Sequence, residues 1–436
     1  MPHIWRERLT SLLCLCISAA LASSFAAAQT NTENFAQFHF NFNNPGARAT
    51  GMGGAYVSIA DDATASEANP AGLTALLRPE FSFEGKGIQF TQHVNNFSST
   101  GPFNNFTVLS KDFKSSLFSP SFASLVFPLR RFVFSVYRYE LVNFESAFYT
   151  EGSFISGKTD GSSFFPVNSD TKLRVVNWGG SAAFKFNEMF SIGLSGGLSN
   201  IDVNSTLARY RLEYFLPQTL ANIAQINDNN GKAFINVGVI FKPAENFSFG
   251  ATYKRRPEFT LHHSFTFSNF PTDSTNIKPI HFNVPSSWSV GASYRPTDVL
   301  TIAFDAVGIN YSALTKDFVP TIDEAAVTAS DYKVDNGVEL HGGAEYVLVL
   351  RSVSFVLRAG FYTEPDNRIR WVGAIGNDPN TMSDRQDEAA LFQSGDSYFH
   401  TTFGLGIVLS NNLQFDVAGN LSKISNEAAG SVVVRF

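Results

Sequence analysis

The sequence predicts an all-β fold, a transmembrane barrel of fourteen antiparallel strands with an N-terminal hatch, or plug, inside its lumen. From about residue 80 onward apolar and polar side chains alternate, as where Leu413 and Phe415 flank Gln414. The gaps between these runs are short and long in turn. A membrane separates the two ends of a barrel's strands and so produces this order, whereas nothing in water imposes it on a soluble sandwich. Residues 29–79 lack the alternation and are available to fill the lumen.

Residues 1–28 have the features of a secretory signal peptide. Arg6 and Arg8 give a basic start, residues 12–21 form an apolar run, and residues 26–28 supply an A-x-A cleavage site. The run is close to the ~7–15 residues of a signal core, which favours this reading over a short membrane anchor.

Composition excludes several other classes of protein. The chain has 32 basic and 38 acidic side chains, which argues against a nucleic-acid binder because such a protein needs a basic face. No stretch after the signal has ~18 consecutive apolar residues, so no transmembrane helix is expected. Cys14 and Cys16 both lie in the signal, so no disulfide is expected after it. The 44 phenylalanines and the low charge of 16% fit a large apolar exterior, an apolar ligand path, or both.

The fourteen expected strands are joined by tight turns at one end and long loops at the other. The strands lie near residues 80–92, 118–128, 131–142, 173–187, 189–202, 233–243, 246–260, 278–295, 298–311, 337–350, 352–364, 396–409, 412–424 and 428–436. Only the short connection at 425–427 breaks the alternation. Short periplasmic turns, long outer loops and an even strand number are the pattern of an outer-membrane barrel.

The strands agree in phase. Phe355 and Leu357 would face lipid while Arg358 faces the lumen. The terminal Phe436 shares the lipid face with Val434, and outer-membrane assembly machinery is expected to read it. Aromatic residues near strand ends are expected either to form interfacial girdles or to pack as ordinary strand residues, namely Trp178, Tyr253, Trp288, Tyr294 and Tyr346.

The predicted hatch, residues 29–79, contains a Gly-rich stretch at 46–55 and a helix start. Asn69 is a good N-cap and Pro70 suits the first helical position. The many small residues favour compact packing inside the lumen over trailing into the periplasm. The glycines do not form a nucleotide loop, because no strand precedes them.

Several segments resemble the FadL-type outer-membrane transporters of long-chain fatty acids and other hydrophobic compounds, the OMPP1/FadL/TodX-like family. Asn69, Pro70 and Ala71 match the hatch motif of that family, although barrel components of a secretion system look similar there. Further matching segments cover most of the chain from residue 46, namely 231–253, 285–296, 341–346 and 357–362.

The resemblance implies a monomeric barrel plugged by its hatch. A long-chain fatty acid or another hydrophobic small molecule would be caught between outer loops, enter a pocket, shift the hatch and leave sideways past a kinked strand. Leaving sideways into lipid avoids exposing an apolar tail to water. The implied partners are the ligand, outer-membrane lipid and lipopolysaccharide, and the barrel assembly machinery, with no cofactor. The alternative is a secretion-system barrel that shuttles or scaffolds protein cargo, or a structural outer-membrane protein.

An apolar capture groove is predicted at residues 205–230, which are too apolar for a solvated loop. We expect one or two short amphipathic helices broken at Pro217, or else a small local core that ties the loop down. The candidate groove residues are Leu207, Tyr210, Phe215, Leu216, Leu220 and Ile223.

A carboxylate ligand would need a cation in the lumen. Arg358 is the first candidate, followed by Arg138 and Arg174. The plainer reading is that Arg358 pairs with Glu345 or Asp305 on neighbouring strands, because a charge in a lumen needs water or a partner.

No catalytic or metal site is predicted. His262 and His263 have no carboxylate or thiol at ligand spacing nearby, and no G-x-S-x-G motif occurs. The chain is therefore not expected to be an enzyme.

Overall fold

The computed structural model describes residues 42–100, 107–154, 163–164, 166–210, 219–268, 274–318, 327–351, 353–378, 385–386, 388–389, 392–410 and 412–436. The predicted signal peptide, both cysteines, Pro217 and the groove residues Phe215 and Leu216 lie outside these ranges. No helix within them is long and apolar enough to cross a membrane.

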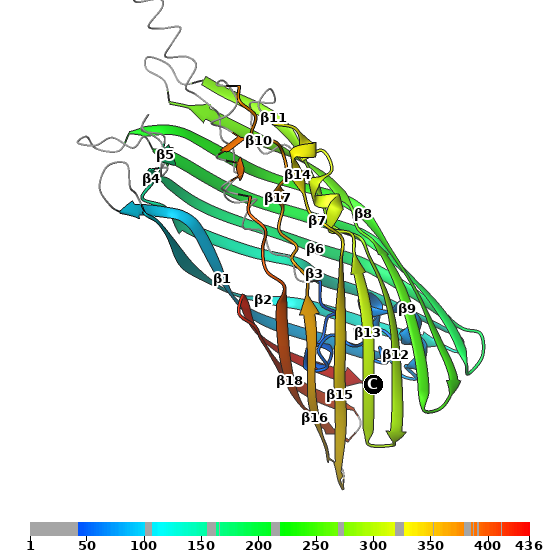
Figure 1. Ribbon diagram of the computed structural model, residues 1–436. Helices are drawn as coiled ribbons and strands as arrows, with labels where there is room; N and C mark the ends of the chain where they lie inside the picture. The colour runs from blue at the N-terminus through cyan, green and yellow to red at the C-terminus, as the bar shows by residue number, and fades with distance from the viewer. Residues whose placement is uncertain are drawn as a thin grey trace, which may run out of the picture.

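Sixteen of the described strands form one antiparallel sheet that closes on itself (Figure 1). β9 and β10 are two halves of one wall strand, interrupted at Arg256 and Pro257, and β11 and β12 are halves of the next. Counted this way, the wall has the predicted fourteen strands, and β1 pairs with β20 to close it. The wall elements are β1 (Glu80–Thr100), β2 (Thr107–Leu129), β3 (Phe132–Tyr149), β6 (Val167–Lys185), β7 (Phe190–Tyr210), β8 (Leu220–Ala244), β9 (Phe247–Arg255), β10 (Glu258–Phe267), β11 (Ser274–Asn283), β12 (Ser287–Thr297), β13 (Leu300–Ile309), β15 (Gly337–Leu350), β16 (Val353–Glu364), β18 (Tyr398–Leu409), β19 (Leu413–Leu421) and β20 (Ser425–Arg435).

Short elements decorate the end of the barrel that carries the long connections, here called the loop end; the opposite end is the turn end. They are the strands β4 (Ser153–Phe154), β5 (Ser163–Phe164), β14 (Tyr332–Lys333) and β17 (Arg370–Trp371), and the 3₁₀ helices η2 (Tyr311–Thr315) and η3 (Ala329–Asp331). The one short connection at the loop end lies at 422–424 instead of 425–427, because Ser422 and Ser425 close the turn with mutual hydrogen bonds.

Several strands continue into stretches that the sequence predicted as loops, notably in β2, β3, β7 and β8. The reason is that the two faces of the wall exchange polarity along the strand. Towards the turn end of β7, Leu198 is exposed on the outer face and Ser195 is buried inside. Towards its loop end, Asp202 is exposed and Val203 is buried inside. Outside a membrane the barrel's exterior meets water, so polar residues there continue the strand rather than end it.

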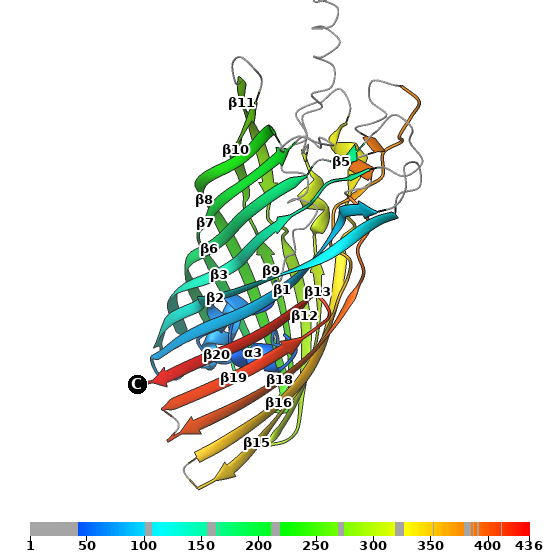
Figure 2. The ribbon, with the colours of Figure 1, turned by 90° about the vertical axis from the view of Figure 1, so that its left-hand side faces the viewer.

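The N-terminal segment, here residues 42–79, lies inside the barrel near its turn end (Figure 2). It contains α3 (Ala47–Gly51), α4 (Ala65–Ala68) and the 3₁₀ helix η1 (Pro70–Ala75). Its backbone carbonyls accept hydrogen bonds from wall hydroxyls on several sides, including Ser124 to Ala63 and Ser181 to Ser66, each at 2.9 Å. The segment is thus held by strands distant from one another in sequence.

Candidate functional site

The Asn69-Pro70 pair is seated against two strands that present glycine to it. Asn69 Oδ1 accepts from the Ala71 amide at 3.2 Å, which caps η1 as the sequence suggested. Its Nδ2 donates to the Val239 carbonyl of β8 at 3.2 Å. A Cβ at Gly238 would lie 2.1 Å from Asn69 Oδ1, and one at Gly193 would lie 2.2 Å from the carbonyl carbon of Pro70. Any side chain at either glycine would therefore displace the segment.

Two residues before Asn69, the buried carboxylate of Glu67 joins the segment to the wall. Arg256 Nη2 lies 2.7 Å and Lys254 Nζ 3.6 Å from Glu67 Oε1. The Tyr137 hydroxyl and the Asn236 amide donate to Oε2 at 2.9 and 3.0 Å. We call these five residues the Glu67 cluster.

Arg256 faces the lumen because it continues the alternation of β9, in which Thr252 and Lys254 are buried and Arg255 is exposed. Pro257 lacks the amide that would continue the ladder to β8. At this break the Arg256 amide donates instead to Ser286 Oγ at 3.0 Å, in the interruption between β11 and β12. The Arg256 side chain is buried.

Towards the loop end, the lumen is filled by apolar side chains. This apolar cluster follows from the exchange of polarity, because the strands turn their apolar residues inward there. Tyr137 belongs to both clusters, and its ring lies 6.3 Å from Phe122 and 6.4 Å from Phe234, measured between centroids. The buried members are Phe122, Tyr137, Tyr139, Leu141, Val142, Phe144, Leu173, Val175, Ile201, Val203, Ile226, Phe234, Phe259, Leu261, Phe282, Val284, Ile309, Tyr311, Leu314, Phe318, Tyr332, Val334, Ile369 and Phe392.

Loops at the loop end cover this apolar cluster and are held by polar contacts. Tyr332 packs edge-on against Trp371 and donates to Glu388 at 2.8 Å, and burial raises the pKa of its hydroxyl. Asp335 accepts from Arg370 and Lys333, and these hydrogen bonds lower the pKa of its carboxyl to about 2. The β14–β17 pairing is thus reinforced by charge at the surface.

The wall is not continuously paired beside the apolar cluster. Among the described residues, the β2–β3 ladder runs from Leu129 and Phe132 only as far as Phe122 and Tyr139. Beyond that point β2 stays with β1 while β3, bulged at Leu141, stays with β6. We call this unpaired stretch the side gap.

Polar side chains bridge the side gap where it begins. Asn143 donates to Ser119 Oγ at 3.2 Å and to Glu140 at 3.0 Å, and Ser119 also donates to Glu140. Arg138 reaches the Pro120 carbonyl. These contacts, here called the polar bridge, replace backbone pairing with side-chain hydrogen bonds.

A hollow of about 540 Å³ lies on the lipid-facing side of the wall next to Arg138. It is lined by exposed apolar residues such as Val136 and Trp178 and by the glycines of β6 and β7. Tyr137 also lines it, so this member of the Glu67 cluster borders the hollow.

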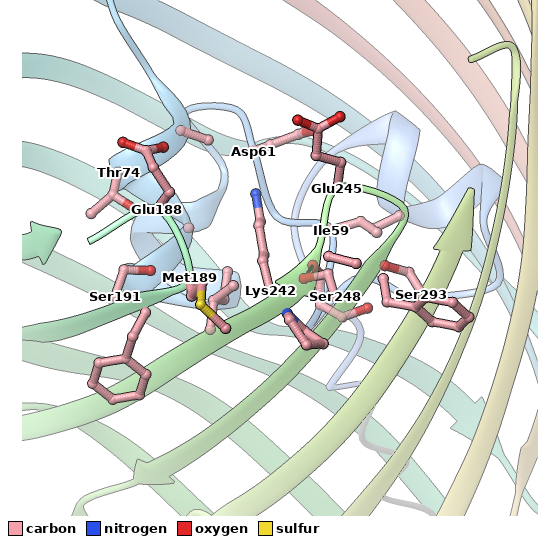
Figure 3. A pocket seen from close by; sticks show the side chains of 18 of the residues that line it. Ile59, Asp61, Thr74, Glu188, Met189, Ser191, Lys242, Glu245, Ser248 and Ser293 are labelled. Carbon is pink, nitrogen blue, oxygen red and sulfur yellow. Dashed lines mark hydrogen bonds between the residues drawn. The ribbon is translucent and has the colours of Figure 1, made fainter. Parts of the chain in front are cut away.

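The turn end of the lumen is polar instead. A cavity of about 490 Å³ lies between the N-terminal segment and the turns that follow β6 and β8. Figure 3 shows Lys242, Glu188 and Glu245 around it, with Asp61 of the segment. The segment therefore divides an apolar upper lumen from a polar lower one.

The predicted lumen cations lie elsewhere than expected or are already paired. Arg358 is buried in the lumen, with Nε 2.7 Å from Glu345 and Nη1 2.6 Å from Asp416. The plainer reading is therefore correct for Glu345. Asp305 is not its partner, because that carboxylate accepts from the amides of the N-terminal segment.

Arg138 and Arg174 are not in the lumen, so that prediction is wrong. Both point to the outer face and lie within 3.3 Å of Glu140. The reason is again the exchange of polarity: this part of the outer wall carries charge, whereas the alternation pattern predicts charge only in the lumen. Lys254 and Arg256 were missed, although an Arg-Pro step inside a strand pattern was a visible signal.

The predicted helices at 205–230 are wrong for the described part. Leu207 and Tyr210 belong to β7, and Leu220 and Ile223 belong to β8. Leu207 is fully buried in a local core with Val94, Phe148 and Val167.

His262 does have a carboxylate neighbour, with Nδ1 2.9 Å from Asp228 Oδ2, which sequence spacing did not reveal. Within the described ranges no three His, Cys, Asp or Glu side chains gather as metal ligands would.

A closed barrel with an apolar exterior near its turn end and an internal segment defines an outer-membrane protein. The chain belongs to the family Outer membrane protein transport protein (OMPP1/FadL/TodX), which matches residues 23–368. This is a family of transporters rather than of enzymes, and its substrates are hydrophobic compounds.

Solved structures show the same fold at low sequence identity. A Pseudomonas aeruginosa FadL homologue is similar with a TM-score of 0.61 and 15% identity, over 91% of this chain and 98% of that one. The Ralstonia pickettii toluene transporter TbuX gives 0.57 and 15%, over 91% and 99%. The Pseudomonas putida toluene transporter TodX gives 0.58 and 15%, over 91% and 98%. No curated protein matches the chain.

Proposed function

We propose that the protein takes up long-chain fatty acids or similar hydrophobic molecules passively, gated by the N-terminal segment as a hatch, with lateral release into the membrane. The observation that carries this proposal is that the apolar cluster directly borders the side gap, through Phe122, Leu141 and Phe144. An apolar molecule in the upper lumen then has the side gap beside it and polar surface below.

The free-energy difference favours the sideways route. Moving an apolar chain into the polar lower cavity would expose it to water, at about 0.8 kcal/mol for each CH₂. The lipid-facing hollow beside Arg138 offers an apolar surface where an emerging chain could lie. The polar bridge would act as the latch of this exit.

The remaining parts of the proposal concern organisation. Residues 1–28 would be a signal peptide, 29–79 the hatch and 80–436 the barrel with its outer loops. The protein would act as a monomer among outer-membrane lipid and lipopolysaccharide, inserted by the barrel assembly machinery through its terminal Phe436.

A capture surface would lie at the loop end of β7 and β8. Tyr210 and Leu220 are paired in register and only partly buried there, and Ile223 is close by on β8. Replacing Leu220 and Ile223 with Ser should weaken uptake while the barrel still assembles, whereas Leu207→Ser should disturb the local core instead. Unchanged uptake in the double variant would refute the capture surface.

The test of function is uptake of labelled oleate and toluene by cells with and without the protein. Protein-dependent uptake of either supports the proposal. Uptake that is independent of the protein, together with defective export of proteins, would point to the secretion-system alternative.

A further inference from the structure

The Glu67 cluster sets two cations against one carboxylate. Lys254 and Arg256 both face Glu67 within 3.6 Å. Nη1 of Arg256 is buried and has no hydrogen-bond partner among the described residues. A buried donor left unsatisfied is costly, so this cluster retains a demand for an anionic acceptor.

The cluster also lies where an apolar ligand would end. Tyr137 donates to Glu67 and contacts Phe122 and Phe234 of the apolar cluster. A hydrocarbon chain packed among those rings would bring its terminal group to Arg256. The group that suits two cations there is a carboxylate.

We propose that Arg256 and Lys254 form the subsite for the ligand's carboxylate, and that Glu67 occupies this subsite in the unliganded protein. The ligand's carboxylate and Glu67 compete for the same two cations, so ligand binding expels Glu67 and unseats the hatch. The inference rests on the proposed function and narrows its substrate class to hydrophobic monocarboxylates.

Exchange of one carboxylate for another preserves the charge at the site. A neutral hydrocarbon that displaced Glu67 would leave two buried cations unpaired, which is strongly unfavourable. A fatty acid replaces the lost charge and hydrogen bonds. The gate therefore responds to the head group as well as to the tail.

Glu67 is well placed to transmit this exchange to the hatch. It lies in α4, two residues before Asn69, whose amide is bonded to the wall at Val239. Moving α4 pulls on that bond and on the seat of Pro70 against Gly193. A contact at one carboxylate is thereby coupled to the whole hatch motif.

A second buried cluster of charged side chains has more acidic than basic groups, the opposite of the Glu67 cluster. Lys86 lies 3.0 Å from Glu427 and 4.0 Å from Glu84, so two carboxylates face one cation. This group repels a carboxylate ligand. It leaves the Glu67 cluster as the favourable position for the head group.

The test compares oleate with oleyl alcohol, which has the same chain without the carboxylate. Binding to the purified full-length barrel in detergent is measured by calorimetry, and a nitroxide on Ala75→Cys, at the exposed end of η1, reports hatch mobility. Wild-type protein should bind oleate about tenfold more tightly than the alcohol, as charge-assisted hydrogen bonds imply. Only oleate should mobilise the label.

Two variants separate the competing carboxylate from the cation. Glu67→Gln should bind oleate about tenfold more tightly than wild type and free the label without ligand, because the internal competitor is weakened. Arg256→Gln should lose the preference for oleate while keeping the alcohol. Heat-modifiable gel mobility verifies that each barrel is folded.

The matched control is Glu345→Gln, which loosens the hatch at Arg48 without touching the two cations. It should free the label but leave the ratio of oleate to alcohol affinity at the wild-type value. Equal affinities of wild-type protein for acid and alcohol would overturn the proposal, as would weaker oleate binding by Glu67→Gln. If cells take up neither oleate nor toluene through the protein, the proposed function itself fails.

Discussion

Arg48 of the N-terminal segment makes a two-pronged contact with Glu345 of β15, with Nε 2.9 Å from Oε2 and Nη2 3.0 Å from Oε1. Arg358 approaches the same carboxylate from β16. The N-terminal segment is thus fixed to the wall by paired, planar hydrogen bonds, the geometry in which arginine binds carboxylates most firmly.

Removing this contact should loosen the segment. Arg48→Ala is expected to weaken the attachment of the segment to the wall by about 3 kcal/mol, because hydrogen bonds between charged groups are lost at a partly buried site. Deuterium exchange of the amides of α3 should quicken and conductance in planar bilayers should rise. Arg131→Ala, in the exposed β2–β3 turn, is the control and should change neither. Unaltered exchange in Arg48→Ala would show that the pair does not hold the segment.

The close contact of the Asn69-Pro70 pair with the wall requires glycine at positions 193 and 238. Gly238→Ala and Gly193→Ala should each push the segment away from the wall, because the new Cβ would lie within 2.2 Å of Asn69 or Pro70 atoms. Amide exchange in η1 is the measurement. Gly430→Ala provides the control, since nothing lies within 4 Å of its added Cβ. Equal exchange in all three variants would contradict the close seat.

The side gap should be needed for release. With Ser119→Cys and Asn143→Cys joined by a short cross-linker, uptake should fall to the level of cells without the protein and return on cleavage of the linker. The matched pair is Val126→Cys with Ser135→Cys, which joins the same two strands where they are already hydrogen-bonded. Full uptake through the cross-linked gap would exclude this exit.

The contact between Asp335 and β17 at the loop end should be lost only at strongly acidic pH. The folded pKa of Asp335 is about 2, below its ordinary 3.8, so its stabilising contribution is complete above 3.8 and is lost as the pH falls toward 2. The fluorescence of Trp371, on the paired strand β17, should therefore change only in that range. Asp335→Asn should lack this acid step, and a step at neutral pH would assign the change to another group.

The barrel could be predicted from sequence because its lipid-facing half obeys one rule throughout: apolar side chains point outward and polar side chains point inward. Leu357 and Phe355 point outward as expected, and Arg358 points inward. The rule fails where lipid ends, and there Arg174 was placed on the wrong face and Leu207 in the wrong element. A pattern fitted to lipid contact contains no information about the water-exposed part of the same strand.

The Glu67 cluster was beyond prediction for a different reason. Glu67, Tyr137 and Arg256 lie far apart in sequence and meet only because the barrel closes and the segment folds back into its lumen. Pairings at such separations are fixed by the closed barrel, and alternation within single strands does not encode them.

The exchange of polarity along β7 and β8 also sets the height of the protein. These strands have 21 and 25 residues, whereas a tilted crossing of the hydrocarbon uses roughly 9–11. About half of β7 and more than half of β8 therefore project beyond the hydrocarbon. A hydrophobic molecule approaching from outside therefore meets the projecting loop end of the barrel before it can dissolve in the surrounding bilayer.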